Sequence, residues 1–324
     1  MSTYSVVIRT LGKSPQLESE LRNICSLSVK PQTVNIYIPE GYKRPDFQIA
    51  SEQYFFVEKG MAAQRLLPYD NVKSDYILML DDDVSLSPKS VETLIEAMEE
   101  YDADLVGADT YKNHKMPFKT KLFVALSNLV FPHWNQKWAF KIHRNGSFSY
   151  LNKPKNSFYW AQSCGGNAML WRMEAYKKLH MEDELWLDNL TFSHGDDMVE
   201  SYKAHVNDMK LGVVYDSGIS HLDSKTASSA YHQSPDKVYT RTMAQFAVWW
   251  RTCYKPGADN FFSRCAAAFA FLLKMIWMFF MFLSLSVGKL KFSYISNFVK
   301  GLKAGWNFVH SENFTSLRPY VVKK

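Results

Sequence analysis

The chain has 324 residues, of which 47% are hydrophobic, 22% charged and 15% aromatic, and its net charge is +6. This balance excludes a disordered chain and allows one large domain or two ordinary ones. The four cysteines form no CxxC pair and RNA- or DNA-binding motifs are absent, so we expect neither a zinc site, nor a disulfide framework, nor a nucleic-acid partner.

The first third of the chain alternates between predicted strands and predicted helices. Short apolar, β-branched runs predict strands at residues 4–9, 33–38, 53–57, 76–80 and 104–108. Helical spacing predicts helices at residues 15–27 and 61–67, and Ser87 followed by Pro88 predicts the capped start of a helix that runs to Glu100. This alternation predicts an α/β fold with a mostly parallel sheet flanked by helices, which binds ligands at the carboxyl ends of its strands.

The middle of the chain has weaker patterns. We expect a helix at residues 118–130 and otherwise loop between residues 111 and 158. Strand character returns over residues 159–171, around a turn that contains Gly165 and Gly166. Beyond this turn we expect helices at residues 172–180 and 195–209 and short strands at residues 211–215 and 218–221.

The end of the chain has the composition of membrane-associated helices. Residues 265–288 are almost wholly apolar, and a bilayer-spanning helix needs roughly 20 residues. Lys274 interrupts this run and would cost roughly 3 kcal/mol at a bilayer centre. Residues 294–309 are amphipathic, with lysines and Trp306, as in an interfacial helix. We expect membrane contact, by spanning or by surface packing; the alternative is a buried core helix.

Three consecutive acids follow the most apolar predicted strand, in the segment YILMLDDDV. Asp81, Asp82 and Asp83 repel one another, which costs stability unless a cation lies among them. Mg²⁺ and Mn²⁺ prefer oxygen ligands and leave positions open for phosphate oxygens. The segment therefore indicates a divalent metal site, and the alternative is an acidic loop that leads into the next helix.

Two more acids open a predicted helix in the segment His194-Gly195-Asp196-Asp197. Acids are favoured at a helix start by the helix dipole, so plain capping explains them equally well. The functional interpretation is a general base, a carboxylate that takes the proton from an attacking hydroxyl.

Weaker signals surround these acids. Gly165 and Gly166, which precede Asn167, allow a close approach of the backbone, and Trp160 could stack on a sugar; an ordinary turn is the alternative. His221 follows a short strand and could bind a metal or be structural. The segment from Arg241 to Arg251 could bring a cation to a diphosphate or form a helix with exposed arginines.

In this order, the motifs resemble the family 2 glycosyltransferases with the GT-A fold, over roughly residues 4–255. The segment YSVVIRT is similar to the family's first strand, LMLDDDV to its Asp-x-Asp motif and GGNAMLWR to its acceptor-side glycine motif. HGDD is similar to its Glu-Asp pair, and VVYDSGISHLD to the segment that ends in a histidine near the diphosphate. The C-terminal tail resembles that of bacterial members that act on lipid-linked glycans.

The resemblance implies roles for individual residues. It implies donor contacts for Arg9, Thr10, Glu40, Arg65, Asp81 and Asp82, metal contacts for Asp81, Asp83 and His221, a catalytic base at Asp197 beside Asp196, and acceptor or sugar contacts for Trp160, Gly165, Gly166 and Asn167. The implied cofactor is Mg²⁺ or Mn²⁺. The implied partners are a nucleotide-sugar donor, a glycan or lipid-linked acceptor and a membrane surface.

The sequence departs from the family pattern in three places. The acid that follows the family's second strand is missing at its usual place, which reads IYIPEGY, so Glu40 is only a possible substitute, and Asp196 replaces the usual Glu. Gln245 is followed by FAVWWR, which differs from the Gln-x-x-Arg-Trp motif of processive members. We therefore expect that this chain alone makes no long polymer.

The sequence thus predicts an inverting, metal-dependent glycosyltransferase of surface polysaccharide biosynthesis, with a catalytic domain at residues 1–255 and membrane-associated helices at residues 256–324. The N-terminal sequence has no charged segment followed by an apolar one, so we expect a peripheral or single-span protein on the cytoplasmic face of the cytoplasmic membrane. One alternative is a non-catalytic sugar-binding membrane protein of the same fold. Another is a nucleotidyltransferase, with Thr10-Leu11-Gly12-Lys13 as its phosphate loop.

Overall fold

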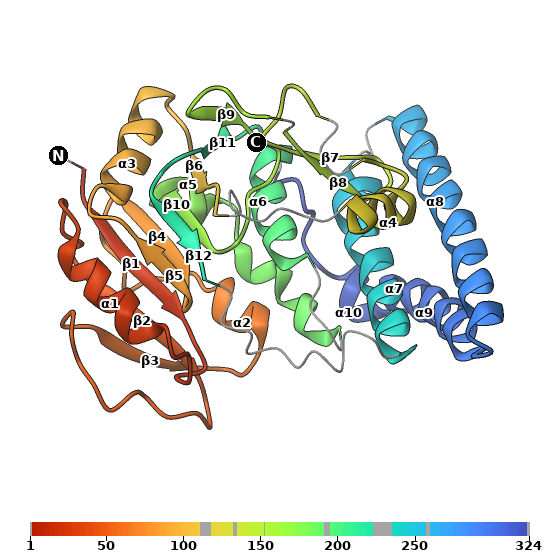
Figure 1. Cartoon of the computed structure of the whole chain (residues 1–324), viewed down its shortest axis with the longest axis horizontal. Helices are drawn as coiled ribbons and strands as arrows, with labels where there is room; N and C mark the ends of the chain where they lie inside the picture. Colours follow the sequence, from red (N-terminus) through yellow and green to blue (C-terminus); the bar gives the residue numbers. More distant parts are fainter. Residues whose placement is uncertain are drawn as a thin grey trace.

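The computed structural model describes residues 2–110, 118–131, 135–151, 153–190, 195–222, 235–256 and 260–322. Its centre is an eight-stranded sheet in the order β3-β2-β1-β4-β10-β6-β11-β9 (Figure 1). β10 and β9 run antiparallel to their neighbours and the other strands run parallel to one another, which confirms the predicted fold class. The strands of this sheet are β1 (Tyr4–Arg9), β2 (Val34–Pro39), β3 (Gln53–Val57), β4 (Tyr76–Asp81), β6 (Leu105–Ala108), β9 (Phe158–Trp160), β10 (Ala168–Arg172) and β11 (Leu211–Val214).

Helices cover both faces of the sheet. On one face lie α1 (Leu17–Ser26) and α3 (Ser90–Glu100). On the other lie α2 (Met61–Arg65), α5 (Met173–Lys178), the 3-10 helix η1 (Met181–Asn189) and α6 (Asp196–Val206). Two small pairs of strands complete the described β structure: β5 (Val84–Leu86) with β12 (Ile219–His221), and β7 (Phe140–Ile142) with β8 (Phe148–Tyr150).

The C-terminal helices form a layer at one end of the molecule (Figure 1). They are α7 (Pro235–Trp249), which continues into the π-helical turn η3 (Trp250–Tyr254), then α8 (Phe261–Gly288), α9 (Ser293–Val309) and α10 (Glu312–Thr315); α4 (Phe118–Asn128) packs against α8. Glycines bring α9 close to α7, because a Cβ at Gly301 would lie 2.6 Å from the Tyr239 carbonyl oxygen, and a Cβ at Gly305 would lie 2.7 Å from the Phe246 Cβ.

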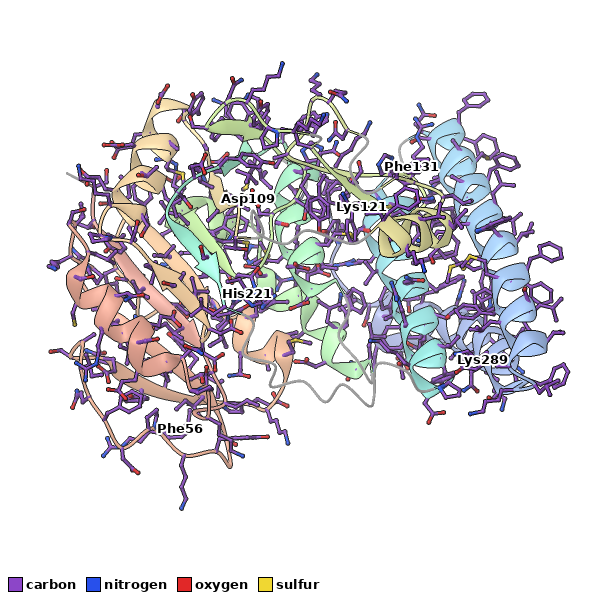
Figure 2. All side chains as sticks on the ribbon, in the orientation of Figure 1. Phe56, Asp109, Lys121, Phe131, His221 and Lys289 are labelled. Carbon is purple, nitrogen blue, oxygen red and sulfur yellow. The ribbon has the colours of Figure 1, made fainter. Side chains whose placement is uncertain are left out.

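Helix α8 has the length and composition of a membrane-spanning helix, with a mean hydropathy of 2.1, and only 28% of its most apolar window is buried. A soluble core helix can pass the same test of length and composition, but most of this helix is not covered. Its exposed apolar side chains project outward along one edge of the molecule (Figure 2). Lys274 points the other way: it is 2% exposed and its Nζ donates to the Ser147 Oγ at 2.9 Å. The lysine is therefore turned into the protein.

After α10 the chain returns to α6. Tyr320 is 2% exposed, its hydroxyl donates to the carbonyl oxygen of Val199 on α6, and its own carbonyl oxygen accepts from the Asn207 Nδ2 at 3.2 Å. The segment that follows the apolar helices is thus part of the core packing.

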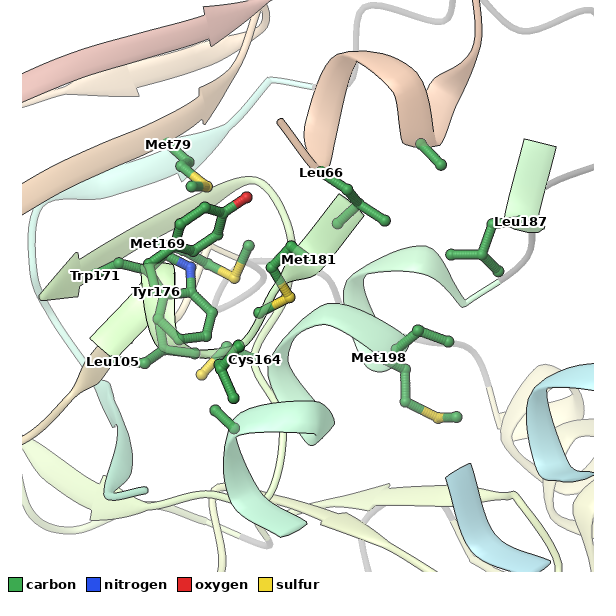
Figure 3. Close-up of a cluster of buried hydrophobic side chains, with 14 of the residues drawn as sticks. Leu66, Met79, Leu105, Cys164, Met169, Trp171, Tyr176, Met181, Leu187 and Met198 are labelled. Atoms are coloured by element: carbon green, nitrogen blue, oxygen red, sulfur yellow. The ribbon is translucent and has the colours of Figure 1, made fainter. Parts of the chain in front are cut away.

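The apolar core lies on both faces of the sheet. Along β4, Ile77 and Met79 belong to the cluster under α2, α5 and α6, whereas Leu78 and Leu80 belong to the cluster under α1 and α3. Figure 3 shows the first cluster, with Met79 close to Trp171 and other large side chains. A strand buried on both faces needs a continuous apolar run, which explains the pattern YILML.

Two expectations for the local structure need correction. The helix expected from Ser87 begins at Ser90, and its N-cap, Lys89, makes no side-chain cap bond. Ser87 packs instead against Gly218, the residue before β12: its amide donates to the Gly218 carbonyl oxygen at 3.0 Å, and its Oγ lies 2.1 Å from the place of a Cβ at Gly218. The β7–β8 pair also lies where we expected loop, because its short strands carry too few residues for a clear alternation.

Candidate active site

Sheet topology brings together two of the motifs. We call Asp81, Asp82 and Asp83 the acid run, and Gly165, Gly166 and Asn167 the glycine turn. β4 ends at Asp81, which is in register with Arg9 at the end of β1. β10 runs in the opposite direction and begins beside the same end of β4, so the turn before it lies next to Asp81. The Asp81 amide donates to the Asn167 carbonyl oxygen at 3.1 Å, and this contact fixes the turn against the acid run.

Two buried arginines hold Asp81. Its Oδ1 accepts from the Arg9 Nη2 at 2.7 Å and from the Arg65 Nη2 at 3.0 Å. The side chains of these arginines are 6% and 11% exposed. The Arg9 Nη2 also donates to the Gly166 carbonyl oxygen at 2.7 Å. Asp81 therefore faces two cations of the protein itself, and it organises the site around its carboxylate.

Arg65 joins the acid run to Asp196 and Asp197, which we call the acid pair. Its second terminal nitrogen, Nη1, lies 2.6 Å from the Asp196 Oδ2, so one guanidinium bridges β4 and the start of α6. The helix that carries Arg65 is anchored by Asp188, whose carboxylate accepts from the amides of Ala62 and Ala63 at 2.9 and 2.7 Å. A Cβ at Gly60 would lie 2.1 Å from the Asp188 Oδ2, so this cap requires glycine.

Asp197 is the acid of the pair that remains accessible. Asp196 is buried, whereas Asp197 is only partly covered, and its Oδ1 accepts from the Met198 amide at 2.9 Å. Burial, reinforced by the charge of Asp196, raises the pKa of Asp197 to about 6. Gly166 is the neighbour across the turn, since a Cβ there would lie 3.0 Å from the Asp197 Cβ. A carboxylate that is accessible, ionised at neutral pH and more basic than usual suits proton abstraction.

Asp83 lies opposite His221. The Asp83 Oδ1 is 3.2 Å from the His221 Nε2, and both side chains are mostly buried. His221 ends β12, in the middle of the molecule (Figure 2). Two ligands held at right angles about 2.1 Å from one divalent ion lie about 3 Å apart, so this pair fits a shared ion. Among the described residues no group of three or more His, Cys, Asp and Glu side chains could hold a metal. Mg²⁺ and Mn²⁺ commonly keep water and phosphate oxygens as further ligands.

Asp82 completes the acid run. Its Oδ2 accepts from the Thr10 hydroxyl, and burial raises its pKa to about 6. Its carbonyl oxygen accepts from the Ser14 hydroxyl at 2.7 Å. Asp82 and Thr10 thus lie side by side at the ends of β4 and β1.

Two buried carboxylates near these motifs were absent from the sequence prediction. Glu200, one turn along α6 from Asp196, is 0% exposed and neither of its side-chain oxygens has a hydrogen-bond partner among the described residues. Burial raises its pKa to about 7. Glu20 on α1 is also 0% exposed, and its pKa is raised well above its usual value by burial. The sequence signal that could have identified both residues is an acidic residue on the apolar face of an amphipathic helix.

The structure does not bring every expected residue to the carboxyl ends of β1 and β4, where the acid run lies. Trp160 pairs with Gly212 near the amino end of β11, at the opposite edge of the sheet, and its ring packs against Tyr101. Glu40 follows β2 at the correct edge and is exposed. Arg251 is buried in ion pairs with Glu184 at 2.7–3.0 Å, so it is not available to a diphosphate.

Two smaller expectations concern the turns beside the site. His194, in the HGDD segment, lies outside the described residues. Gly12, expected in a phosphate loop by the nucleotidyltransferase alternative, is instead packed against the next loop, since a Cβ there would lie 2.2 Å from the Lys43 carbonyl oxygen. Gly12 therefore serves the packing of this loop.

Comparison with known proteins gives one family match. Residues 54–178 match the model of glycosyl transferase family 2, a span that includes the acid run and the glycine turn. No curated protein matches the chain. Among solved structures, the chain is similar to a mannosyltransferase, PcManGT from Pyrobaculum calidifontis, in complex with GDP-Man and Mn²⁺. The TM-score is 0.46 and the identity 11%, over 96% of this chain and 88% of that chain.

Proposed function

We propose, from the premise that this chain carries a family 2 glycosyltransferase domain and uses a nucleotide-sugar donor, that it transfers the sugar with inversion to a hydroxyl of a lipid-linked glycan. The reaction would serve surface polysaccharide synthesis at the cytoplasmic face of a membrane. The observation that carries the proposal is the bridge made by Arg65, which joins Asp81 of the acid run to Asp196 of the acid pair. This bridge supports a single site, because it joins the candidate donor end to Asp196, the residue next to the candidate base.

The donor end of the site is the edge formed by Asp81, Asp82 and Asp83. Asp83 and His221 are the residues that would hold Mg²⁺ or Mn²⁺, which supplies Lewis-acid stabilisation of the leaving diphosphate when bound. Asp81, fixed by Arg9 and Arg65, sets the position of the acid run against the glycine turn. Asp82, Thr10 and the exposed Glu40 lie along the same edge, where the nucleoside would bind.

Asp197 is the proposed base. At neutral pH a carboxyl with a pKa of about 6 is mostly ionised, yet it is a better proton acceptor than an ordinary aspartate. Asp196 cannot take this role while Arg65 neutralises it at 2.6 Å. If the acceptor hydroxyl is activated by Asp197 on one side of the sugar and the diphosphate leaves on the other, the anomeric centre inverts, by the facial logic of inverting glycosidases.

The membrane part of the proposal rests on α8. The inward position of Lys274 removes the charge that would oppose contact with lipid, and the outer face keeps large apolar side chains exposed. An exposed apolar face of this length suits a helix that lies on or in a membrane.

The test combines binding and transfer. With Mn²⁺ present, one nucleoside diphosphate should raise the melting temperature, and chelator should remove the effect. Asp83→Asn should lose this metal-dependent stabilisation. Asp197→Asn should keep it, yet transfer labelled sugar to membrane lipid about 10²–10⁴-fold more slowly, the usual contribution of a general base.

The control is Asp70→Asn, which changes an exposed acid outside the site and should alter neither measurement. A normal rate of sugar transfer by Asp197→Asn would show that Asp197 is not the general base. The absence of stabilisation by any nucleoside diphosphate would contradict the donor site itself.

A further inference from the structure

An open groove of about 1090 Å³ lies between α7, α8 and α9, with the end of α4 at its rim. Its walls are large apolar side chains of α8, among them Trp277, Phe280 and Leu285. It is distinct from the acid edge of the sheet, because no residue of the candidate active site lines it. The groove opens beside the apolar outer face of α8.

Positive charge gathers in this groove. Lys237 and Arg241 on α7 and Lys289 and Lys291 after α8 line it, and its described lining includes no acid. Figure 2 marks Lys289 at the end of α8. The neighbouring acid in sequence, Asp236, is near the Asn297 Nδ2, at 3.5 Å. The lining is therefore complementary to a ligand that is both anionic and apolar.

Arg241 is the cation that most needs a partner. It is exposed to solvent and makes no hydrogen bond or ion pair with any described residue. Burial lowers the pKa of Lys237, and the charge of Arg241 lowers it further. Like charges held together in this way favour the binding of an anion between them.

Helix α7 leads from this cation to the proposed base. Arg241, Gln245 and Val248 follow one face of the helix at spacings of four and three residues. Gln245 lines the groove, and its buried Oε1 has no hydrogen-bond partner among the described residues. A Cβ at Gly195, the residue before Asp196, would lie 4.0 Å from the Val248 Cγ1. Seven residues of helix span about 10 Å, a distance that a phosphate-linked sugar can bridge.

We propose that the groove binds the lipid carrier of the acceptor, a long-chain lipid that bears a phosphate or diphosphate group. The phosphate binds Arg241 with Lys237 beside it, and the hydrocarbon chain lies against the apolar wall of α8. The attached glycan extends along α7 toward Asp197. This inference rests on the proposed function, because it assigns the acceptor of that same reaction.

The experiment measures binding of farnesyl diphosphate to the full chain in a non-ionic detergent by calorimetry, with inorganic diphosphate and farnesol as matched probes. Farnesyl diphosphate should bind at least tenfold more tightly than either probe, because only it carries both features of the ligand. Arg241→Gln should weaken its binding at least tenfold. Lys300→Gln, which removes an exposed lysine of α9 outside the groove, should leave it unchanged.

Further arms separate the groove from the donor site and from ordinary membrane lipid. Asp83→Asn should keep farnesyl diphosphate binding, and Arg241→Gln should keep metal-dependent stabilisation by the nucleoside diphosphate. Equal competition by phosphatidylglycerol would overturn the assignment to an acceptor carrier, as would binding that survives Arg241→Gln or is lost with Asp83→Asn. Each of these outcomes leaves the proposed function standing if the nucleoside diphosphate still binds.

Discussion

Two groups of buried charge share helix α6, and they differ in how well each charge is matched. The first, the neutralised cluster, is built around Glu184, which is 0% exposed and accepts from Arg251, Trp186 and Lys203. Although burial alone would raise the pKa of Glu184, Lys203 and Arg251 hold it below its usual value. Such a cluster holds helices together and keeps its carboxylate ionised.

The second, the acid-rich cluster, contains Asp81, Asp196, Asp197 and Glu200 around Arg9 and Arg65. Its four acids face two cations, and two of the acids have raised pKa values, about 6 for Asp197 and about 7 for Glu200. The comparison shows where the fold accepts an electrostatic cost. The carboxylate proposed as the base lies in a cluster with an excess of negative charge, whereas the carboxylate of the neutralised cluster is fully matched by cations.

The largest expected effect comes from breaking the neutralised cluster. Glu184→Ala would leave Lys203 and Arg251 buried without their carboxylate, and removal of one partner of a buried pair costs about 3–5 kcal/mol. Thermal and urea unfolding should show this loss. Glu96→Ala, a change of an exposed acid on α3, is the control and should unfold like the wild type. A Glu184→Ala protein of unchanged stability would mean that the cluster does not hold α6, η1 and η3 together.

A smaller effect of opposite sign is expected from Glu200→Gln. The pKa of Glu200 is raised from about 4.5 to about 7 in the folded protein, so folding favours its protonated form. Its favourable contribution is present below pH 4.5 and is lost as the pH rises toward 7. At about 1.4 kcal/mol for each pKa unit, Glu200→Gln should stabilise the protein by roughly 3 kcal/mol at pH 8.

The measurement for Glu200 is the melting temperature at pH 5 and pH 8. The gain of Glu200→Gln over the wild type should be larger at pH 8, where the wild type carries the buried charge. Glu96→Gln, on an exposed surface, should show no such difference. If Glu200→Gln and the wild type have equal melting temperatures at pH 8, the ionised Glu200 carboxylate does not destabilise the folded protein, and the prediction is wrong.

The smallest expected effect is the pH dependence of transfer. Because a base acts only when ionised, kcat/KM should fall below the pKa of Asp197, about 6, by about tenfold for each pH unit. Asp82 has a similar pKa, so Asp82→Asn is the control: its residual activity should keep the same lower limb. If the fall of kcat/KM at low pH disappears in Asp82→Asn, the fall is caused by titration of Asp82 and not of Asp197.

The sequence predicted the parts of the site that depend on local patterns. The run YILML predicted a strand, and the acids after it predicted a polar strand end; Asp196 and Asp197 opened a helix as expected. The partners of these acids could not be predicted, because nothing in the local sequence around Arg65 shows that it will reach both Asp81 and Asp196.

Strand direction explains the main difference at the site. Trp160 precedes the glycine turn by only a few residues, which suggested a shared pocket, but β9 runs antiparallel to β11 and ends at the far edge of the sheet. Hydrophobic pattern has the same period in parallel and antiparallel strands, so it does not reveal which edge a strand end reaches. Lys274 is a similar case, since composition does not show which way a side chain on α8 points.

The return of the chain to Tyr320 has a consequence for how the molecule could be shortened. Deleting everything after α7 would remove not only the apolar helices but also the phenol that donates to Val199, three residues from Asp196. The apolar helices and the Tyr320 contact that supports α6 therefore cannot be removed separately by truncation after α7. A version with a less apolar surface would come from polar substitutions on the outer surface of α8, with the tail left in place, rather than from truncation.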